Sequence, residues 1–319
     1  MSCDGTSTRS STRPASAHCS AASESSPPWR RRREASLPGG SVQPVFKLMG
    51  IVNVTPDSFS DGGTFDSSGA AIAHAQGLIA EGAQIVDVGG ESTRPGAEPV
   101  GVDAELRRVL PVIEAIDGAQ ISIDTMKLEV ARAAVGAGAT LVNDVTAFRH
   151  DPGMAAFVAE HDLDCCLMHM LGEPRTMQAD PRYEDVVSDV KAFLHDRLAF
   201  AVREGVKEER ILLDPGFGFG KTLEHNLELL RRIGELTALG RPVVVGVSRK
   251  SFIGRITGRD VASRAVGTAA ANVLAYERGA RVFRVHDVAV TGDALAIANA
   301  TLPPLCSHPT TTPTTTRRT

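Results

Sequence analysis

Polar side chains stand at the carboxyl ends of short apolar runs that recur between residues 46 and 302. They comprise carboxylates, carboxamides, a lysine, an arginine and two histidines: Asn53, Asp87, Asp124, Asn143, His169, Asp214, Lys250, Arg284 and His286. A barrel of strands needs only apolar side chains to pack its interior. Polar groups at so many strand ends therefore indicate a site where chemistry takes place.

Four of these side chains have complementary hydrogen-bonding chemistry: Asp124, Asn143, Asp214 and Lys250. A carboxylate accepts two parallel N–H bonds, a carboxamide offers a donor and an acceptor, and an ammonium donates to a carbonyl oxygen or ring nitrogen. The set predicts a pocket for a flat heterocycle with a guanine-like or pterin-like edge.

Arg284 and His286 are two residues apart in the last expected strand, so strand alternation places both on one face. Two cationic or donor groups there suit a phosphate. The chain has no H-E-x-x-H motif and no Cys/His ligand spacing, which argues against a structural zinc site. A magnesium ion held mainly by substrate phosphates needs only one protein oxygen, for which the Asn53 amide is the candidate.

The run DPGFGFGKT at residues 214–222 ends like a phosphate-binding P-loop but does not fit that motif. The P-loop needs a glycine five places before Gly220, where Pro215 offers no backbone N–H. The dinucleotide-binding fingerprint also fails, because its third glycine would fall on Lys221. We interpret the run as a flexible loop that brings its backbone and Phe219 close to a bound ring.

Two further loops are long and glycine-rich, at residues 53–63 and 89–96. Both exceed the length of a minimal connection between a strand and a helix. They are typical of loops that cover a substrate.

Short β-rich runs alternate with longer helical patterns between residues 46 and 302, which predicts βα units and a parallel sheet. Strands are expected at 47–54, 84–88, 120–123, 140–145, 164–169, 211–214, 242–247 and 281–286. Helices are expected at 69–81, 103–116, 128–137, 225–239, 264–278 and 293–300. Eight units predict a single-domain α/β fold, the (β/α)8 TIM barrel; an open doubly wound sheet is the alternative.

The two ends of the chain differ in composition from this region. Residues 1–45 are rich in serine and arginine, and residues 303–319 consist mostly of threonine and proline, so both are expected to be disordered. Their net charges are +3 and +2, so the formal total of −4 leaves about −9 on residues 46–302. An acidic barrel disfavours a nucleic-acid-binding role.

Cysteine usage and hydropathy predict the compartment. The five cysteines form no C-x-x-C pair, as expected of a reduced, cytoplasmic protein. No run of 18 apolar residues occurs, and residues 1–45 lack the apolar core of a secretory signal, so no membrane association is expected.

Eight segments resemble signatures of the dihydropteroate synthase family, of the pterin-binding superfamily, and they follow in the family's order. They are MGIVNVTPDSFSDGG (49–63), DVGGESTRPG (87–96), SIDT (122–125), VNDV (142–145), LMHM (167–170), DPGFGFGK (214–221), SRKS (248–251) and RVHDV (284–288). The resemblance covers the whole of residues 46–302 and implies a pterin-binding (β/α)8 barrel.

The resemblance implies a transferase of folate biosynthesis. It would join 6-hydroxymethyl-7,8-dihydropterin diphosphate to 4-aminobenzoate, releasing pyrophosphate and forming 7,8-dihydropteroate. Similar enzymes use Mg2+, are homodimers and are sulfonamide targets.

The matching positions carry the family's site residues. Asp124, Asn143, Asp214 and Lys250 would hold the pterin, and Asn53, Arg284 and His286 would hold the diphosphate with Mg2+. The aminobenzoate site would consist of Phe59, Thr93, Arg94, Pro95, Phe219, Lys250 and Ser251. The residues implied to be catalytic are Asn53, Lys250, Arg284 and His286.

An SN1-like path fits this reaction, because loss of pyrophosphate leaves a cation conjugated to an electron-rich ring. No strong base is then required, in agreement with the lack of an acid/base dyad among the motifs. Two other functions remain open, a non-catalytic paralogue that binds pterin and a pterin-dependent methyltransferase with a corrinoid partner.

Overall fold

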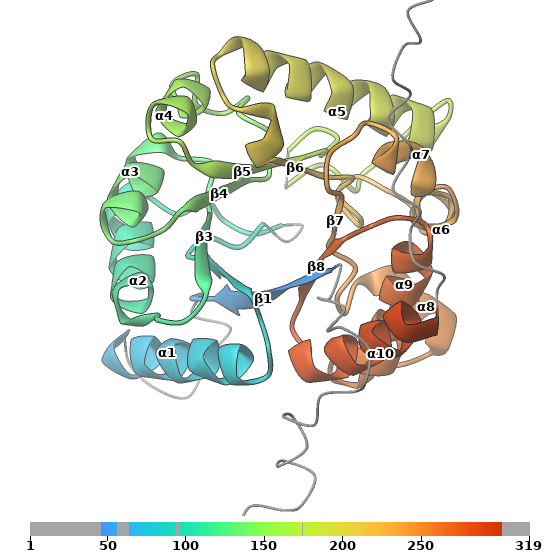
Figure 1. The fold of residues 1–319 in the computed structure, drawn as a ribbon, viewed down its shortest axis with the longest axis horizontal. Coiled ribbons are helices and arrows are strands. Elements are labelled where there is room, and N and C mark those ends of the chain that lie inside the picture. The colour runs from blue at the N-terminus through green and yellow to red at the C-terminus, as the bar shows by residue number, and fades with distance from the viewer. Residues whose placement is uncertain (1–45, 56–63, 94–95, 174, 302–319) are drawn as a thin grey trace, which may run out of the picture. The chain divides into compact units, whose positions relative to one another are not determined.

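The computed structural model describes residues 46–55, 64–93, 96–173 and 175–301 (Figure 1). The segments expected to be disordered, 1–45 and 303–319, lie outside the described residues. Among the described residues no helix is both long and apolar enough to cross a membrane.

Eight parallel strands form one sheet in the described part of the chain. They are β1 (Lys47–Asn53), β2 (Ile85–Gly89), β3 (Gln120–Asp124), β4 (Leu141–Asp144), β5 (Asp164–Met168), β6 (Ile211–Asp214), β7 (Val244–Val245) and β8 (Val282–Val285). Their order in the sheet is β6-β5-β4-β3-β2-β1-β8-β7. A single bridge between Leu213 and Val243 joins the two edge strands and closes the barrel.

Helices surround the strands, as Figure 1 shows in the view along the barrel. They are α1 (Thr64–Ala80), α2 (Val102–Ala115), α3 (Leu128–Gly136), α4 (Met154–Glu160), α5 (Val186–Arg203), α6 (Leu223–Arg231), α7 (Gly234–Thr237), α8 (Ser251–Thr257), α9 (Ala265–Glu277) and α10 (Val288–Thr301). Short 3-10 turns lie at Glu208–Arg210 and Val261–Ser263. The expected (β/α)8 barrel is confirmed, and the open doubly wound sheet is excluded by the closing bridge.

Strand alternation divides the apolar side chains between two cores. The larger core lies between the sheet and the helices, and includes Val52, Val86, Val142 and Leu213. The smaller core consists of Met49, Ile85, Leu141, Cys166, Val244 and Val282, one from each of six strands. In a barrel these side chains form an apolar layer inside the strands.

The next inward-facing position along several strands is polar. Asp87 follows Ile85 by two residues, Asn143 follows Leu141 by two, and Arg284 follows Val282 by two. Because side chains of a strand repeat every second residue, these groups lie on the same face as the apolar layer. The interior of the barrel therefore changes from apolar to polar toward the carboxyl ends of the strands.

Two expected elements differ from the structure. The expected strand 242–247 is reduced to Val244–Val245, since the chain leaves the sheet at Gly246 and turns at 248–249. The expected helix 225–239 is two helices, α6 and α7. They are separated at residues 232–233, and Gly234, which begins α7, approaches the Arg278 carbonyl so closely that a Cβ would lie 3.3 Å from its oxygen.

Other boundaries shift without changing the topology. The last helix begins at Val288 instead of residue 293, and the first begins at Thr64 instead of 69. Helices α4, α5 and α8 were not delimited from the sequence. Asp185 caps α5 by accepting a hydrogen bond from the Val187 amide at 3.1 Å.

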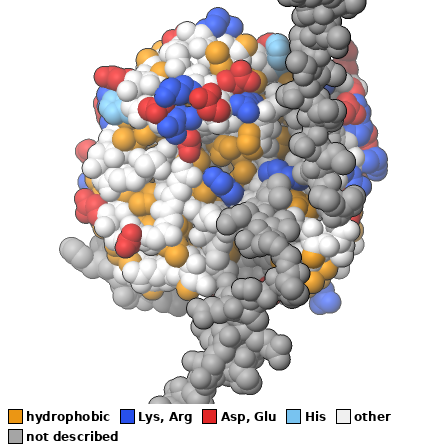
Figure 2. Space-filling model, viewed as in Figure 1, with side chains coloured by type: hydrophobic (Ala, Val, Ile, Leu, Met, Phe, Trp, Pro, Cys, Tyr) orange, Lys and Arg blue, Asp and Glu red, His pale blue; other side chains and the backbone are white. Residues whose placement is uncertain are grey.

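Charged side chains of opposite sign lie beside one another on the face shown in Figure 2. Ion pairs of this kind occur among the described residues, for example Asp162 with Lys207 at 2.9 Å and with Arg210 at 2.8 Å. Such exposed pairs each contribute little to the free energy of folding.

The loop after β6 requires glycine at Gly216. This residue has a φ of +65°, and a Cβ there would lie 1.9 Å from the His169 carbonyl oxygen. Gly240 also has a positive φ, of +78°, but a Cβ there would meet no atom within 4 Å.

We expect Gly216→Ala to destabilise the fold more than Gly240→Ala. Backbone strain at Gly240 costs about 1 kcal/mol of unfolding free energy. At Gly216 the contact with His169 adds about 1–3 kcal/mol. Urea unfolding of the two variants measures the difference, and equal destabilisation would contradict the packing argument.

Candidate active site

Asp87 is the centre of a hydrogen-bond network inside the barrel. Its Oδ1 accepts from the Ser122 hydroxyl at 2.5 Å, and its Oδ2 accepts from Asn143 Nδ2 at 3.1 Å and from Arg284 Nε at 2.6 Å. Asp87 and Ser122 are fully buried. Four strands thus contribute to one polar layer: Asp87 is on β2, Ser122 on β3, Asn143 on β4, and Arg284 on β8, which β1 separates from β2.

Arg284 spans the barrel between two carboxylates. Its Nη2 donates to Asp124 Oδ2 at 2.7 Å, in addition to the bond from Nε to Asp87. Burial alone would lower the pKa of Arg284, but the charges of Asp87 and Asp124 raise it above its ordinary value. The guanidinium is therefore a permanent cation, and its third nitrogen, Nη1, donates to no described residue.

Asp124 and Asn143 each keep an acceptor toward the mouth of the barrel. Burial raises the pKa of Asp124 to about 7, although the Arg284 charge opposes this effect. Its Oδ1 accepts no hydrogen bond from the described residues. The Asn143 amide donates to Asp87, so its carbonyl oxygen is the group left for a ligand.

Asp214 ends β6 on the other side of the mouth. Its Oδ1 accepts from the Gly216 amide at 2.7 Å. Burial raises the pKa of Asp214, while the Gly216 amide and the charge of Lys250 oppose the shift. Lys250, which precedes α8, places its ammonium 4.1 Å from the centre of the Phe219 ring. This cation–π contact joins the loop after β6 to the loop after β7.

His286 follows β8 and is oriented by Ser248. The His286 amide donates to Ser248 Oγ at 3.1 Å, and the same Oγ lies 2.9 Å from His286 Nδ1. A hydroxyl that accepts the amide proton can donate its own proton to Nδ1, which leaves the ring proton on Nε2. Ser248 thus fixes the tautomer of His286.

Arg249 holds the turn that carries Ser248 and Lys250. Its φ is +54°, uncommon for a residue with a side chain, and its guanidinium pairs with both oxygens of Asp287 at 2.5 and 3.0 Å. The strained turn is therefore tied directly to the loop after β8.

Asn53 is half-buried at the end of β1, beside Gly89 of β2. Its side chain forms no hydrogen bond with the other described residues, so its amide oxygen is available to a ligand. In the described ranges, no group of three or more His, Cys, Asp or Glu side chains is arranged to hold a metal ion. This donor set fits a Mg2+ ion bound by one protein oxygen and by phosphate oxygens, since Mg2+ retains most of its shell as waters or phosphates.

The loop after β2 is closed by an ion-pair cluster. Lys127 donates to Glu91 and to Glu105, each at 2.5 Å, and Glu91 accepts from the Val100 amide at 3.0 Å. The loop so closed carries Thr93, which is half-buried. Phe59, Arg94 and Pro95, expected in the aminobenzoate site, lie outside the described residues.

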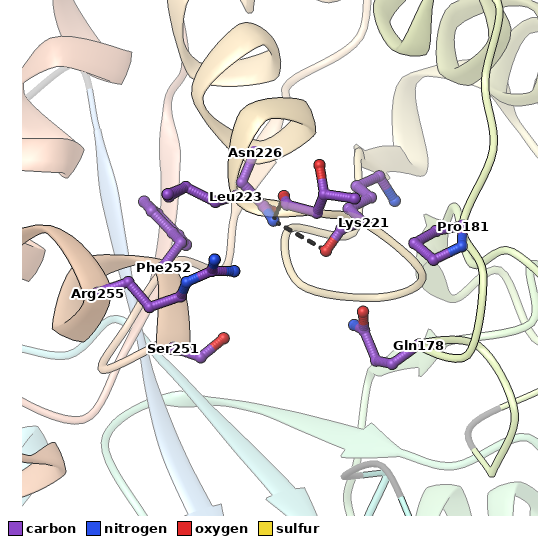
Figure 3. A pocket seen from close by; sticks show the side chains of 9 residues that line it. Gln178, Pro181, Lys221, Leu223, Asn226, Ser251, Phe252 and Arg255 are labelled. Atoms are coloured by element: carbon purple, nitrogen blue, oxygen red, sulfur yellow. Dashed lines mark hydrogen bonds between the residues drawn. The ribbon is translucent and has the colours of Figure 1, made fainter.

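A cavity of about 220 Å3 lies beside Ser251 (Figure 3). Its walls come from the loops after β5 and β6, from α6 and from α8, and include Gln178, Asn226 and Arg255. Its lining includes Ser251, which follows Lys250 in the chain, but not Asp124 or Arg284.

The structure brings together most of the residues expected from the sequence. Asp124, Asn143 and Arg284 are linked through Asp87, and Asp214, Lys250 and Phe219 lie together on the opposite side. Two functional roles escaped the sequence reasoning, those of Ser122 and Ser248. Ser122 could have been found from strand parity, because it aligns with Asp87 in the register of β2 and β3.

A barrel with a buried charge network at the carboxyl ends of its strands is the architecture of a small-molecule enzyme. The sequence profile of the family described as "Pterin binding enzyme" matches residues 49–286. The dihydropteroate synthase of Escherichia coli K12 is 48% identical over 260 residues, covering 80% of this chain and 91% of the relative. That of Bacillus subtilis is 46% identical over 244 residues, covering 76% and 83%.

Solved structures of dihydropteroate synthases are similar to this chain in fold and sequence. Dihydropteroate synthase of Xanthomonas albilineans with 4-aminobenzoic acid superposes with a TM-score of 0.76 at 50% identity, covering 81% of this chain and 94% of that one. The Yersinia pestis enzyme in a sulfonamide drug complex gives 0.77 at 42% identity, covering 83% and 98%. The chain belongs to the pterin-binding enzymes. Within that family it is a member of the dihydropteroate synthases, which are transferases of folate biosynthesis.

We expect the unfolding free energy of Asp124→Asn, relative to that of the native chain, to rise as pH increases from 5 to 8. A carboxyl group with a folded pKa near 7 and an ordinary value of 3.8 favours folding at low pH, and this contribution is lost as pH rises through 7. Asparagine does not ionise, so the unfolding free energy of the variant relative to the native chain should increase by about 2 kcal/mol over this range. Urea unfolding at both pH values is the measurement; the same difference at pH 5 and pH 8 would contradict it.

Proposed function

We propose that this chain condenses 6-hydroxymethyl-7,8-dihydropterin diphosphate with 4-aminobenzoate, forming 7,8-dihydropteroate and pyrophosphate. The observation that carries the proposal is the Arg284 guanidinium held between Asp87 and Asp124, with Nη1 left for a further acceptor. One side of this cation faces carboxylates suited to a pterin, and the remaining donor suits a phosphate. The Xanthomonas albilineans relative solved with 7,8-dihydropteroate, 48% identical to this chain, supports this reading.

The pterin lies between the two sides of the barrel mouth. Asp124 and Asp214 accept hydrogen bonds from its amino and ring N–H groups, and the Asn143 carbonyl oxygen accepts another. The Lys250 ammonium donates to the pterin carbonyl or a ring nitrogen. Burial makes each of these bonds electrostatically stronger than it would be in water.

The diphosphate lies toward β1 and β8. Arg284 Nη1 and the Nε2 proton of His286 donate to its oxygens, and the Asn53 amide oxygen would hold Mg2+ together with phosphate oxygens. When bound, Mg2+ neutralises part of the charge on pyrophosphate as it leaves.

The aminobenzoate lies at the Phe219 side. Its ring packs against Phe219, and its carboxylate is bound by the Lys250 ammonium and the Ser251 hydroxyl. Thr93 closes this site, together with Phe59, Arg94 and Pro95, which are proposed from the family signature alone.

The chemical step is an SN1-like substitution. The C–O bond of the pterin methylene breaks, pyrophosphate takes the electron pair, and the arylamine nitrogen then forms a bond to the methylene carbon. The amine proton leaves to water or to pyrophosphate. Arg284 and His286 stabilise the charge that develops on the leaving oxygen, and the enclosed site keeps water from the cation.

We also propose that the enzyme is a cytoplasmic homodimer and a sulfonamide target. Exposed apolar side chains near α8 and α9 support a second copy as partner, namely Ile256, Val261 and Val266, each more than half exposed. The drug complex of the Yersinia pestis relative supports sulfonamide binding.

A pyrophosphate-release assay tests the reaction. Purified protein receives the dihydropterin diphosphate and Mg2+, with or without 4-aminobenzoate. We expect release that depends on the amine, with 7,8-dihydropteroate as product. Pterin binding without release would indicate a non-catalytic paralogue, and neither binding nor release would favour the corrinoid-dependent methyltransferase.

We expect Ser248→Ala to lower kcat/KM for the dihydropterin diphosphate by about tenfold, because His286 loses the partner that fixes its tautomer. Ser188→Ala removes an exposed hydroxyl on α5, which accompanies the Asp185 cap, and is the matched control. Steady-state kinetics measure both variants. An unchanged kcat/KM for Ser248→Ala would contradict the proposed contact between His286 and the diphosphate.

A further inference from the structure

Lys221 is a buried lysine that none of the proposed substrate contacts uses. Lys221 is 3% exposed to solvent. Its ammonium lies 2.9 Å from His169 Nδ1, and donates to the carbonyl oxygens of Gly216 at 2.9 Å and Phe219 at 3.0 Å. Burial lowers the pKa of Lys221 to about 7. Three acceptors match the three hydrogens of its ammonium form, and the neutral amine has fewer hydrogens, so no donor remains for a phosphate in either form.

His169 is suited to be one of these acceptors. Burial, together with the charges of Lys221 and Arg149, lowers the pKa of His169 to about 2. The ring is therefore neutral at physiological pH, with Nδ1 as the acceptor and Nε2 as the donor. The backbone of His169 also binds the loop's base, since its amide donates to the Asp214 carbonyl at 2.9 Å.

The loop that Lys221 binds is rich in glycine. Gly216, Gly218 and Gly220 all have left-handed φ values, of 65°, 79° and 64°. Such glycines are permissive toward other conformations, so the loop depends on contacts from outside. The Asn226 side chain accepts from the Gly218 amide at 2.7 Å, and Tyr183 donates to the Gly220 carbonyl at 2.8 Å. Of Lys221, Asn226 and Tyr183, only Lys221 donates to the carbonyl oxygen of Phe219.

Phe219 connects this loop to the substrate sites. The Lys250 ammonium lies over the Phe219 ring, 4.1 Å from the ring centre. Gly218, next to it, packs so closely on Lys250 that a Cβ there would lie 3.1 Å from Lys250 Cδ. A displacement of the Phe219 backbone would therefore move the surface on which the arylamine packs.

Lys221 itself does not face a substrate. Figure 3 shows its ammonium on the side away from Ser251 and Arg255. The Asn226 side chain donates to its carbonyl oxygen at 3.3 Å and to that of Thr222 at 2.6 Å, which fixes the main chain at this point.

We propose that Lys221 is a positioning residue that holds Phe219 in place to receive the arylamine. The inference rests on the proposed function, and it gives the Gly-Lys-Thr run at 220–222 a role other than phosphate binding. The ammonium acts as an internal cross-link that joins β5, through His169, to both ends of the Gly216–Phe219 turn.

Steady-state kinetics of Lys221→Met test the proposal, with Lys207→Met as a matched control on the surface. We expect the KM for 4-aminobenzoate to rise at least tenfold, while the Kd for the dihydropterin diphosphate changes less than threefold. The control should leave both unchanged. An unchanged KM, or an equal loss of affinity for both substrates, would overturn the proposal.

A double-mutant cycle with Phe219→Leu separates positioning from general destabilisation. If Lys221 acts through Phe219, Lys221→Met should lower kcat/KM for the amine at least tenfold in the native background and less than threefold in the Phe219→Leu background. Equal losses in both would overturn the proposal. Should Lys221→Met fail to fold, Lys221→Gln keeps two donors and takes its place in the cycle.

A structural readout keeps this test separate from the proposed reaction. In a Phe219→Trp background, Lys221→Met should shift the indole emission and increase its quenching by iodide, whether or not the enzyme turns over. No difference would overturn the positioning role. A native enzyme that releases no pyrophosphate, together with a clear fluorescence change, would instead contradict the proposed function alone.

Discussion

The rest of the site depends on charge balance around Arg284. A guanidinium inside a barrel is costly unless carboxylates neutralise it, and carboxylates at the same depth are costly without the cation. Asp87 and Asp124 meet this need from two neighbouring strands, and Ser122 and Asn143 supply the remaining hydrogen bonds to Asp87. Removing any one of these groups would leave the others with buried charge or unpaired polar atoms.

The same balance gives the site its chemistry. Asp87 and Asp124 accept from Nε and Nη2 of Arg284, so the guanidinium divides these acceptors from its remaining donor, Nη1. A substrate that carries N–H donors on its ring and a diphosphate on its side arm matches this division. The protein therefore stabilises a leaving anion with a charge that its own fold already holds in position, so little reorganisation accompanies the reaction.

Sequence periodicity was sufficient to predict the eight strands, the barrel and the strand-end residues, since parallel strands bring their carboxyl ends to one edge. It did not predict the break at residues 232–233 between α6 and α7, after which Gly234 packs against the carbonyl of Arg278, a residue distant in the chain. Nor did it predict the pairing of Ser248 with His286, because that contact depends on the turn at Arg249 and on its tie to Asp287. Side-chain partners across loops are set by tertiary packing, which local patterns do not encode.

The closure of the barrel has a consequence for its mechanics. Seven of the eight strand interfaces are continuous ladders, whereas β6 and β7 meet at the single Leu213–Val243 bridge. Asp214 ends one of these strands, and the chain leaving the other leads to Lys250. A ring bound by both residues would bridge the β6–β7 interface. The substrate would then add contacts at the strand interface that has the fewest hydrogen bonds.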